Sequence, residues 1–149
     1  MDWNEVYTSE PGFRITCLTA RHFSGRFLRQ NPSLWASFML EGHSTVYIGG
    51  DSGYGAHFSE IGKRFPHIDL AILENGQYNE DWRYIHTMPE QLPAEIHELD
   101  AAKVLPMHNS KFSLSRHAWD EPAHRIEQAA ARDSSLHVIH GIIGSPITY

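Results

Sequence analysis

Apolar and polar residues alternate in the first third of the chain with the two-residue period that is typical of strands. Alternation over residues 13–20 predicts a half-buried strand. Two apolar stretches, 34–40 and 45–48, flank a Glu-Gly-His-Ser turn, and this arrangement predicts a β-hairpin. Residues 1–12 are polar and end in a Pro-Gly turn pair. Residues 21–33 are rich in Gly, Asn and Pro and are expected to form a loop.

The period changes to that of helices after residue 55. Residues 56–65 carry apolar side chains three and four positions apart, as one face of a helix does. A continuous apolar run at 68–73 predicts a buried strand. The pattern Thr87-x-x-Glu90 has the form of a capping box and predicts a helix that extends to about residue 100.

Strand and helix patterns continue to alternate up to the end of the chain. Residues 104–107 predict a strand, and residues 120–132 predict a helix whose first turn is acidic, as the helix dipole favours. Residues 136–139 and 147–149 are expected to be closing strands. The order helix, strand, helix, strand, helix indicates an α/β fold. Neither a repeat nor a linker interrupts it, so residues 1–149 are expected to form a single unit.

The composition is that of one globular domain. The chain has 149 residues, of which 41% are hydrophobic and 20% charged, and a chain of this length can bury a sizeable core. A formal net charge of −6 argues against nucleic acid as a partner, since that requires a basic face. Cys17 is the single cysteine, which favours a reducing compartment, and we expect the cytoplasm. Apolar runs are too short for a transmembrane segment.

Three polar side chains with metal-binding chemistry each follow a predicted strand. His22 and His108 come shortly after apolar strands, and Asp51 lies in a glycine-rich turn that presents its carboxylate at a strand end. Strand ends at one edge of a sheet converge on a common crevice. Imidazole and carboxylate groups suit zinc or a similar divalent ion, and Glu74, at the end of another strand, is a candidate to contact them. Spacing alone leaves open that these are unrelated loop residues.

Several short motifs follow one another along the chain from about residue 13 to 130. They are TARHFSGR at 19–26, LWAS at 34–37, GGDSGYG at 49–55, EIGKRF at 60–65, DLAI at 69–72, NGQY at 75–78, IHTMPE at 85–90, LPMH at 105–108 and DEP at 120–122. In order and spacing they resemble the C-terminal half of the metallo-β-lactamase-fold hydrolases. Within that family they are most similar to the branch of N-acyl-phosphatidylethanolamine-hydrolysing phospholipase D.

The resemblance implies an αββα sandwich, of which this chain would form the C-terminal half as a mixed sheet with flanking helices. It implies two divalent metal ions, zinc or another metal, between the two sheets. His22, Asp51 and His108 match metal ligands, and Asp51 matches the carboxylate that bridges the ions. His86 matches a histidine near the ligands or the substrate, so Asp51 and His86 are the expected catalytic residues. The implied reaction is hydrolysis of a phosphodiester or related ester, small-molecule or lipid, by a metal-bound hydroxide.

The H-x-H-x-D-H motif of that family is missing from this sequence. Because this motif supplies four of the family's ligands, residues 1–149 are expected to carry an incomplete active site. A half-domain also leaves one apolar sheet face uncovered, which predicts a homodimer or other homo-oligomer through that face. The alternative interpretation is a non-catalytic half-domain that acts as a binding or association module.

Overall fold

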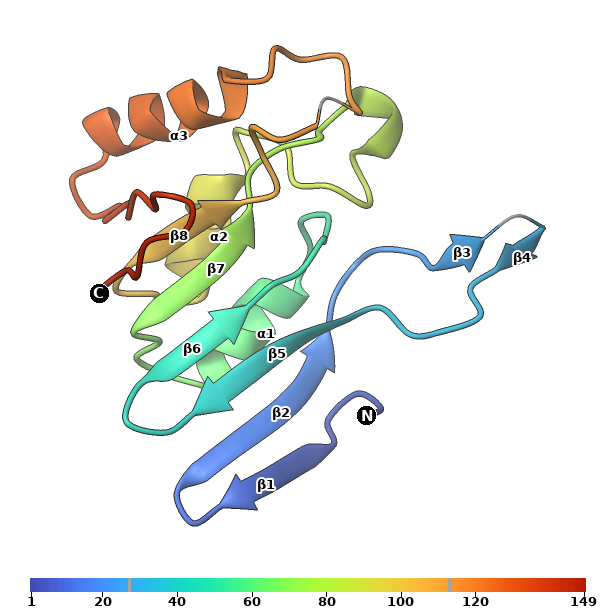
Figure 1. The fold of residues 1–149 in the computed structure, drawn as a ribbon, viewed down its shortest axis with the longest axis vertical. Helices are drawn as coiled ribbons and strands as arrows, with labels where there is room; N and C mark the ends of the chain where they lie inside the picture. The colour runs from blue at the N-terminus through green and yellow to red at the C-terminus, as the bar shows by residue number, and fades with distance from the viewer. Residues whose placement is uncertain (27, 113) are drawn as a thin grey trace.

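A mixed β-sheet with helices on one side organises the chain (Figure 1). The computed structural model describes residues 1–26, 28–112 and 114–149. In this part of the chain six strands form one sheet in the order β1-β2-β5-β6-β7-β8, and β3 pairs with β4 in a separate ribbon. The strands are β1 (Val6–Glu10), β2 (Phe13–Thr19), β3 (Gly25–Arg26), β4 (Arg29–Gln30), β5 (Ala36–Glu41), β6 (Thr45–Ile48), β7 (Leu70–Glu74) and β8 (Val104–Met107). The helices are α1 (His57–Arg64), the short 3-10 helix η1 (Glu80–Trp82), α2 (Leu92–Glu98) and α3 (Glu121–Arg132).

The strand directions decide where the loops meet. Strands β1, β2, β5 and β6 pair antiparallel with their neighbours, whereas β6, β7 and β8 are mutually parallel. Parallel pairs need a crossover, which α1 provides between β6 and β7 and α2 provides between β7 and β8. Because β5 is antiparallel to both β2 and β6, strand β2 runs in the same direction as β6, β7 and β8. These four strands therefore end at one edge of the sheet.

The hydrophobic core lies between the sheet and the helices. Tyr47 and Met39, from adjacent strands, are fully buried, and the Tyr47 ring meets Phe58 of α1 edge-on with centroids 6.5 Å apart. Ile96 of α2 and Ile126 of α3 belong to the same cluster of buried residues. The helices α1 and α2 lie behind β5, β6 and β7 in Figure 1. Burial of these apolar faces fixes the orientation of the whole sheet.

The opposite face of the sheet is also apolar. Successive strand residues point to opposite sides, so Val46 and Ile48, which flank Tyr47, point away from α1. The strand register aligns this row across the sheet, from Phe38 to Ile48 and on to Ile72 and Leu105. Among the described residues no helix covers this side (Figure 1). We call it the open face; its half-buried members are Ile15, Phe38, Leu40, Val46, Ile48, Ile72 and Leu105.

Most predicted elements are confirmed, and three expectations are wrong. The predicted loop after β2 contains the β3–β4 ribbon. The polar opening, for which no element is predicted, forms an edge strand, β1. The expected closing strands are absent from the described residues, where only a single bridge joins Val104 to Val138. The capping box is wrong as well, because α2 begins at Leu92 and the Thr87 side chain bonds elsewhere.

Candidate metal centre

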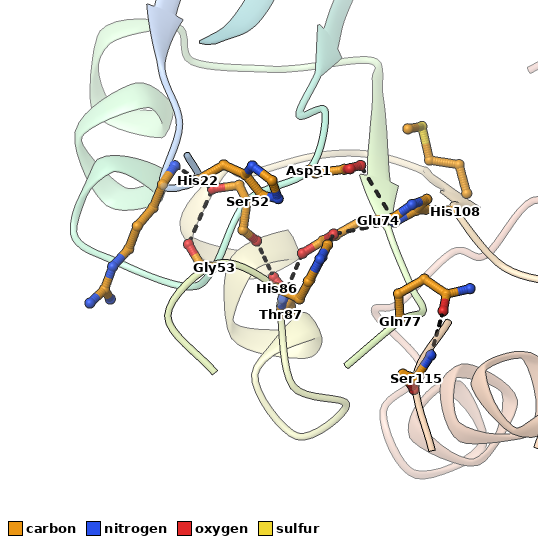
Figure 2. Close-up of polar contacts among 12 residues, drawn as sticks. His22, Asp51, Ser52, Gly53, Glu74, Gln77, His86, Thr87, His108 and Ser115 are labelled. Carbon is orange, nitrogen blue, oxygen red and sulfur yellow. Dashed lines mark hydrogen bonds and ion pairs between the residues drawn. The ribbon is translucent and has the colours of Figure 1, made fainter. Parts of the chain in front are cut away.

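Five polar side chains meet at the edge where β2, β6, β7 and β8 end. His22 follows β2, Asp51 follows β6, Glu74 is the last residue of β7 and His108 directly follows β8. His86 reaches the same place from the loop after η1. Figure 2 shows these side chains around one small region. The three residues that the sequence predicts as metal ligands are therefore brought to one sheet edge, together with the predicted catalytic histidine.

Asp51 and His108 face each other across the ends of β6 and β8. Asp51 Oδ1 lies 3.4 Å from His108 Nδ1, and Glu74 Oε2 lies 3.6 Å from the same nitrogen. The backbone after each strand is left-handed, at Gly50 (φ 65°) and at His108 itself (φ 62°). For a histidine this conformation is disfavoured, and such residues concentrate at functional sites.

The His108 imidazole occupies a strongly negative environment. Its Nδ1 atom is buried and makes no hydrogen bond with any described residue, although two carboxylates lie within 4 Å. The Glu74 carboxylate and, to a smaller extent, Asp51 raise the pKa of His108 against the opposing effect of burial. A cation, either a proton or a metal ion, is therefore favoured between these groups.

Glu74 and His86 form a buried pair beside His108. Glu74 Oε2 lies 2.7 Å from His86 Nδ1, and the two side chains are 3% and 10% exposed. The other carboxylate oxygen accepts the Thr87 backbone N–H at 2.6 Å. The ionised carboxylate can only accept hydrogen bonds, so the neutral His86 ring carries its proton on Nδ1 and leaves Nε2 as the basic nitrogen.

His22 lies on the other side of His86. The two rings meet edge-on with centroids 5.3 Å apart, and the His22 ring stacks on Phe23. His22 Nδ1 lies 2.7 Å from the Phe23 carbonyl oxygen, which can only accept, so Nδ1 carries the proton. In the neutral ring, Nε2 is therefore the nitrogen without a proton, as a metal ligand requires.

The donor set fits a divalent metal ion. One ligand atom each from Glu74, His86 and His108 lie within 4.8 Å of one another, and Asp51 adds a second carboxylate to the same cluster. Imidazole nitrogens combined with carboxylate oxygens are typical of zinc sites. The unbonded Nδ1 of His108 is an independent sign that a group belongs there, since buried polar atoms are almost always paired.

A cavity adjoins His108. Its volume is about 570 Å³, and Gln77, Leu105, Met107, Phe112 and Ile143 are among the residues that line it. The walls are mostly apolar, with polar groups near His108. A ligand that carries an apolar portion can therefore lie beside the polar cluster.

The sequence predicts the four residues His22, Asp51, His86 and His108, and the structure brings all four to one sheet edge. The tight cluster of ligand atoms is a different set, Glu74, His86 and His108, in which His108 is the one predicted ligand; Asp51 joins it through His108, and the His22 ring lies beside His86. Their roles as ligands and catalytic groups remain predictions. Glu74, considered only as a neighbour, lies at the centre of the cluster and contacts both His86 and His108. Its signal in the sequence is a carboxylate that terminates an apolar strand, as with Asp51.

The chain resembles known proteins over most of its length. The family described as "Beta-lactamase superfamily domain" matches residues 1–109. The outer membrane protein RomA of Klebsiella pneumoniae is 53% identical over 95 residues, which cover 63% of this chain and 72% of RomA. The mitochondrial N-acyl-phosphatidylethanolamine-hydrolyzing phospholipase D of Saccharomyces cerevisiae is 35% identical over 85% of this chain, but the match spans only 27% of the yeast protein.

A solved structure shows the same fold. Igni18, described as a novel metallo hydrolase from the archaeon Ignicoccus hospitalis, superimposes on 100% of this chain and 59% of its own with a TM-score of 0.75 at 21% identity. The predicted metallo-β-lactamase type of α/β fold, a mixed sheet with flanking helices, is therefore confirmed. No helix among the described residues is both long and apolar enough to cross a membrane. By its sequence and its fold, the chain belongs to the beta-lactamase superfamily domain family, and it is related to the N-acyl-phosphatidylethanolamine-hydrolysing phospholipase D branch.

Proposed function

We propose that this chain supplies His22, Asp51 and His108 to the metal centre of a hydrolase that cleaves a phosphodiester or related ester. The observation that carries the proposal is the position of His108 Nδ1, which is buried without a hydrogen bond between the carboxylates of Asp51 and Glu74. Three protein ligands with one open coordination position are the usual arrangement of a catalytic zinc site. A second ion would need ligands beyond these three. In the family that this chain resembles, the H-x-H-x-D-H motif supplies them, and this sequence does not contain that motif.

The roles follow from the contacts of each residue. When bound, a divalent ion lowers the pKa of a water molecule and stabilises charge that develops on substrate oxygens. Asp51 and the imidazoles of His22 and His108 would hold the ion. His86 would contact the reacting groups with its basic Nε2, while Glu74 keeps the proton on Nδ1. The apolar cavity beside His108 supports an ester with an apolar group, a lipid ester included.

Metal content is the direct test. Protein purified without chelator is expected to hold about one zinc or other divalent ion per chain, measured by elemental analysis. His22→Ala and His108→Ala are expected to lose it, whereas His43→Ala, at an exposed histidine in the β5–β6 turn, is expected to retain it. Hydrolysis of a chromogenic phosphodiester by the loaded protein would then test the reaction. Metal-free wild-type protein that fails to take up zinc would contradict the proposal for this chain.

The open face favours a second candidate function, association without catalysis. Its half-buried apolar side chains extend across β2, β5, β6, β7 and β8, and surfaces of this kind mark interaction sites. We propose that a second copy of the chain covers it in a homodimer. A dimer that binds no metal would support the association module, whereas metal uptake with hydrolysis would support the enzyme.

The lone buried Cys17 supports the cytoplasm as the location, which cell fractionation would test.

A further inference from the structure

A second layer of buried polar groups lies beneath the candidate metal centre. Ser52, Thr87 and Glu95 are 2%, 3% and 1% exposed, and they come from the Asp51 turn, the loop that carries His86, and helix α2. Hydrogen bonds join all three segments. None of these residues was a predicted site residue, and none is a candidate ligand.

Thr87 links the layer to the site through two different groups. Its backbone N–H donates to Glu74 Oε1, the carboxylate that contacts His86 and His108. Its hydroxyl oxygen lies 2.8 Å from the backbone carbonyl oxygen of Ser52, the residue next to Asp51 (Figure 2). The position of Thr87 therefore fixes both the Asp51 turn and the Glu74 carboxylate.

The hydroxyl of Thr87 also lies 2.5 Å from Glu95 Oε1. A hydroxyl has one proton to donate, and the Ser52 carbonyl oxygen can only accept, so that proton belongs to the carbonyl. The short contact with Glu95 then needs a proton from Glu95 itself. If Glu95 were ionised, the single hydroxyl proton could serve only one of the two acceptors. The other acceptor, either the Ser52 carbonyl or the Glu95 carboxylate, would then lose its hydrogen bond at a buried position, which is costly.

The surroundings of Glu95 favour the same protonation state. Burial raises the pKa of Glu95 well above its ordinary value, and the nearby carboxylates of Glu74 and Glu98 raise it further, against the opposing effect of Thr87. The hydroxyls of Tyr47 and Tyr54 are the further titratable groups on which the Glu95 charge acts. A basic side chain that would stabilise an ionised carboxylate is not among these neighbours.

We propose that Glu95 is a positioning residue, a protonated acid whose O–H donates to the Thr87 hydroxyl. This bond fixes the position of Thr87 and, through it, the positions of the Asp51 turn and the Glu74 carboxylate. The chain of donors runs from Glu95 to the Thr87 hydroxyl and on to the Ser52 carbonyl. In parallel, the Thr87 N–H orients Glu74, which in turn fixes the His86 ring. The functional meaning of this arrangement rests on the proposed metal centre, whereas the arrangement itself exists without a metal.

Two measurements on the metal-free full chain test the inference without relying on hydrolysis. Infrared spectroscopy at neutral pH is expected to show a buried protonated carboxyl C=O band that disappears in Glu95→Gln. Nitrogen NMR of the imidazoles is expected to show His86 protonated on Nδ1. A spectrum in which every glutamate is ionised at neutral pH would overturn the proposal.

Matched variants separate positioning from mere packing. Glu95→Gln keeps a donor and Thr87→Ser keeps the hydroxyl, so both are expected to preserve the His86 signals. Glu95→Met and Thr87→Val break the same contact from its two sides, and both are expected to shift those signals. His86 signals that are unchanged in a folded Glu95→Met or Thr87→Val variant would contradict the positioning role. If neither folds, the infrared comparison of wild type with Glu95→Gln decides alone. Failure of zinc uptake with these results intact would refute only the proposed function.

Discussion

Glu74 holds His86 by a hydrogen bond of 2.7 Å inside the protein, at the point where β7 ends. The carboxylate is shared, because Oε1 accepts the Thr87 N–H while Oε2 accepts from His86 and lies 3.6 Å from His108. A single side chain thus sets the tautomer of one imidazole and the electrostatic environment of another. For the proposed ligand His108, a contact of this kind would set the orientation and basicity of the ring.

Replacing Glu74 with Gln should disturb both functions of the carboxylate. An amide has one acceptor oxygen for two buried donors, so the amide NH₂ would face a donor. The free energy of unfolding is expected to fall by about 1–3 kcal/mol, and zinc affinity by roughly 10–100-fold. Urea denaturation and zinc titration measure these changes. Glu90→Gln, at an exposed position, is the control and should leave both unchanged.

His57 should make the stability of the fold depend on pH. Burial first, and then the Arg21 guanidinium, lower the pKa of His57 to about 4 from 6.5. As the pH falls below 6.5, the unfolded chain takes up a proton on His57, whereas the folded chain does so only near pH 4. The contribution of His57 to the free energy of unfolding is therefore complete above pH 6.5 and is lost as the pH falls from 6.5 to about 4.

The contribution of His57 can be isolated by difference. The loss is expected to be on the order of 1 kcal/mol, because solvent screens the partly exposed ring. The neutral ring also bonds Ser52 Oγ at 3.1 Å. Urea unfolding of wild type and His57→Gln at a series of pH values measures it, with the exposed His43→Gln as control. Parallel pH profiles for wild type and His57→Gln would contradict the assignment.

Gly62 should resist substitution although it lies inside a helix. A Cβ at this position of α1 would come within 2.0 Å of the Glu98 carbonyl oxygen at the end of α2. Alanine normally stabilises a helix relative to glycine by about 1 kcal/mol, but here it would force the two helices apart. We expect Gly62→Ala to lower the free energy of unfolding by about 1–3 kcal/mol. Thermal denaturation would show this, and Lys63→Ala, exposed on the same helix, should have little effect.

The open face should determine the oligomeric state. Phe38 lies within it, and a charge there would be buried without a partner in a dimer. Light scattering after size exclusion is expected to show a dimer for wild type at micromolar concentration and a monomer for Phe38→Lys. The charge-matched Gln128→Lys, on the exposed side of α3, should remain dimeric. A monomeric wild type would refute the proposed interface.

Sequence patterns predict the elements whose side chains alternate clearly and end at turn residues. Strands β6 and β8 match their predicted bounds, since glycines follow the first and polar residues follow the second. Strand β1 escapes prediction because it is an edge strand. It pairs with β2 through its backbone, while Val6 and Tyr7 remain 54% and 55% exposed and leave no apolar pattern.

From the residue pattern alone, the candidate site is predictable only in the residues that follow strands, whereas His86 is predicted from the family resemblance. His22, Asp51 and His108 are conspicuous because each follows an apolar run. Glu95 is not, because a glutamate within a helix has the pattern of a solvated surface residue until the tertiary structure buries it. Thr87 was misinterpreted for a related reason. Its hydroxyl has the spacing of a helix cap, but partners distant in sequence take up its hydrogen-bonding capacity.

The placement of the cluster at the ends of β2, β6, β7 and β8 also has a kinetic consequence. His22 and His108 are far apart in sequence, and the strands that carry them are separated by β5, β6 and β7 in the sheet. Long-range and parallel pairings of this kind form slowly, because the chain must close large loops before the contacts stabilise it. The five side chains can therefore meet only after the sheet is complete from β2 to β8. A metal ion would therefore bind only to chains that have finished refolding, and partly folded chains would not bind it.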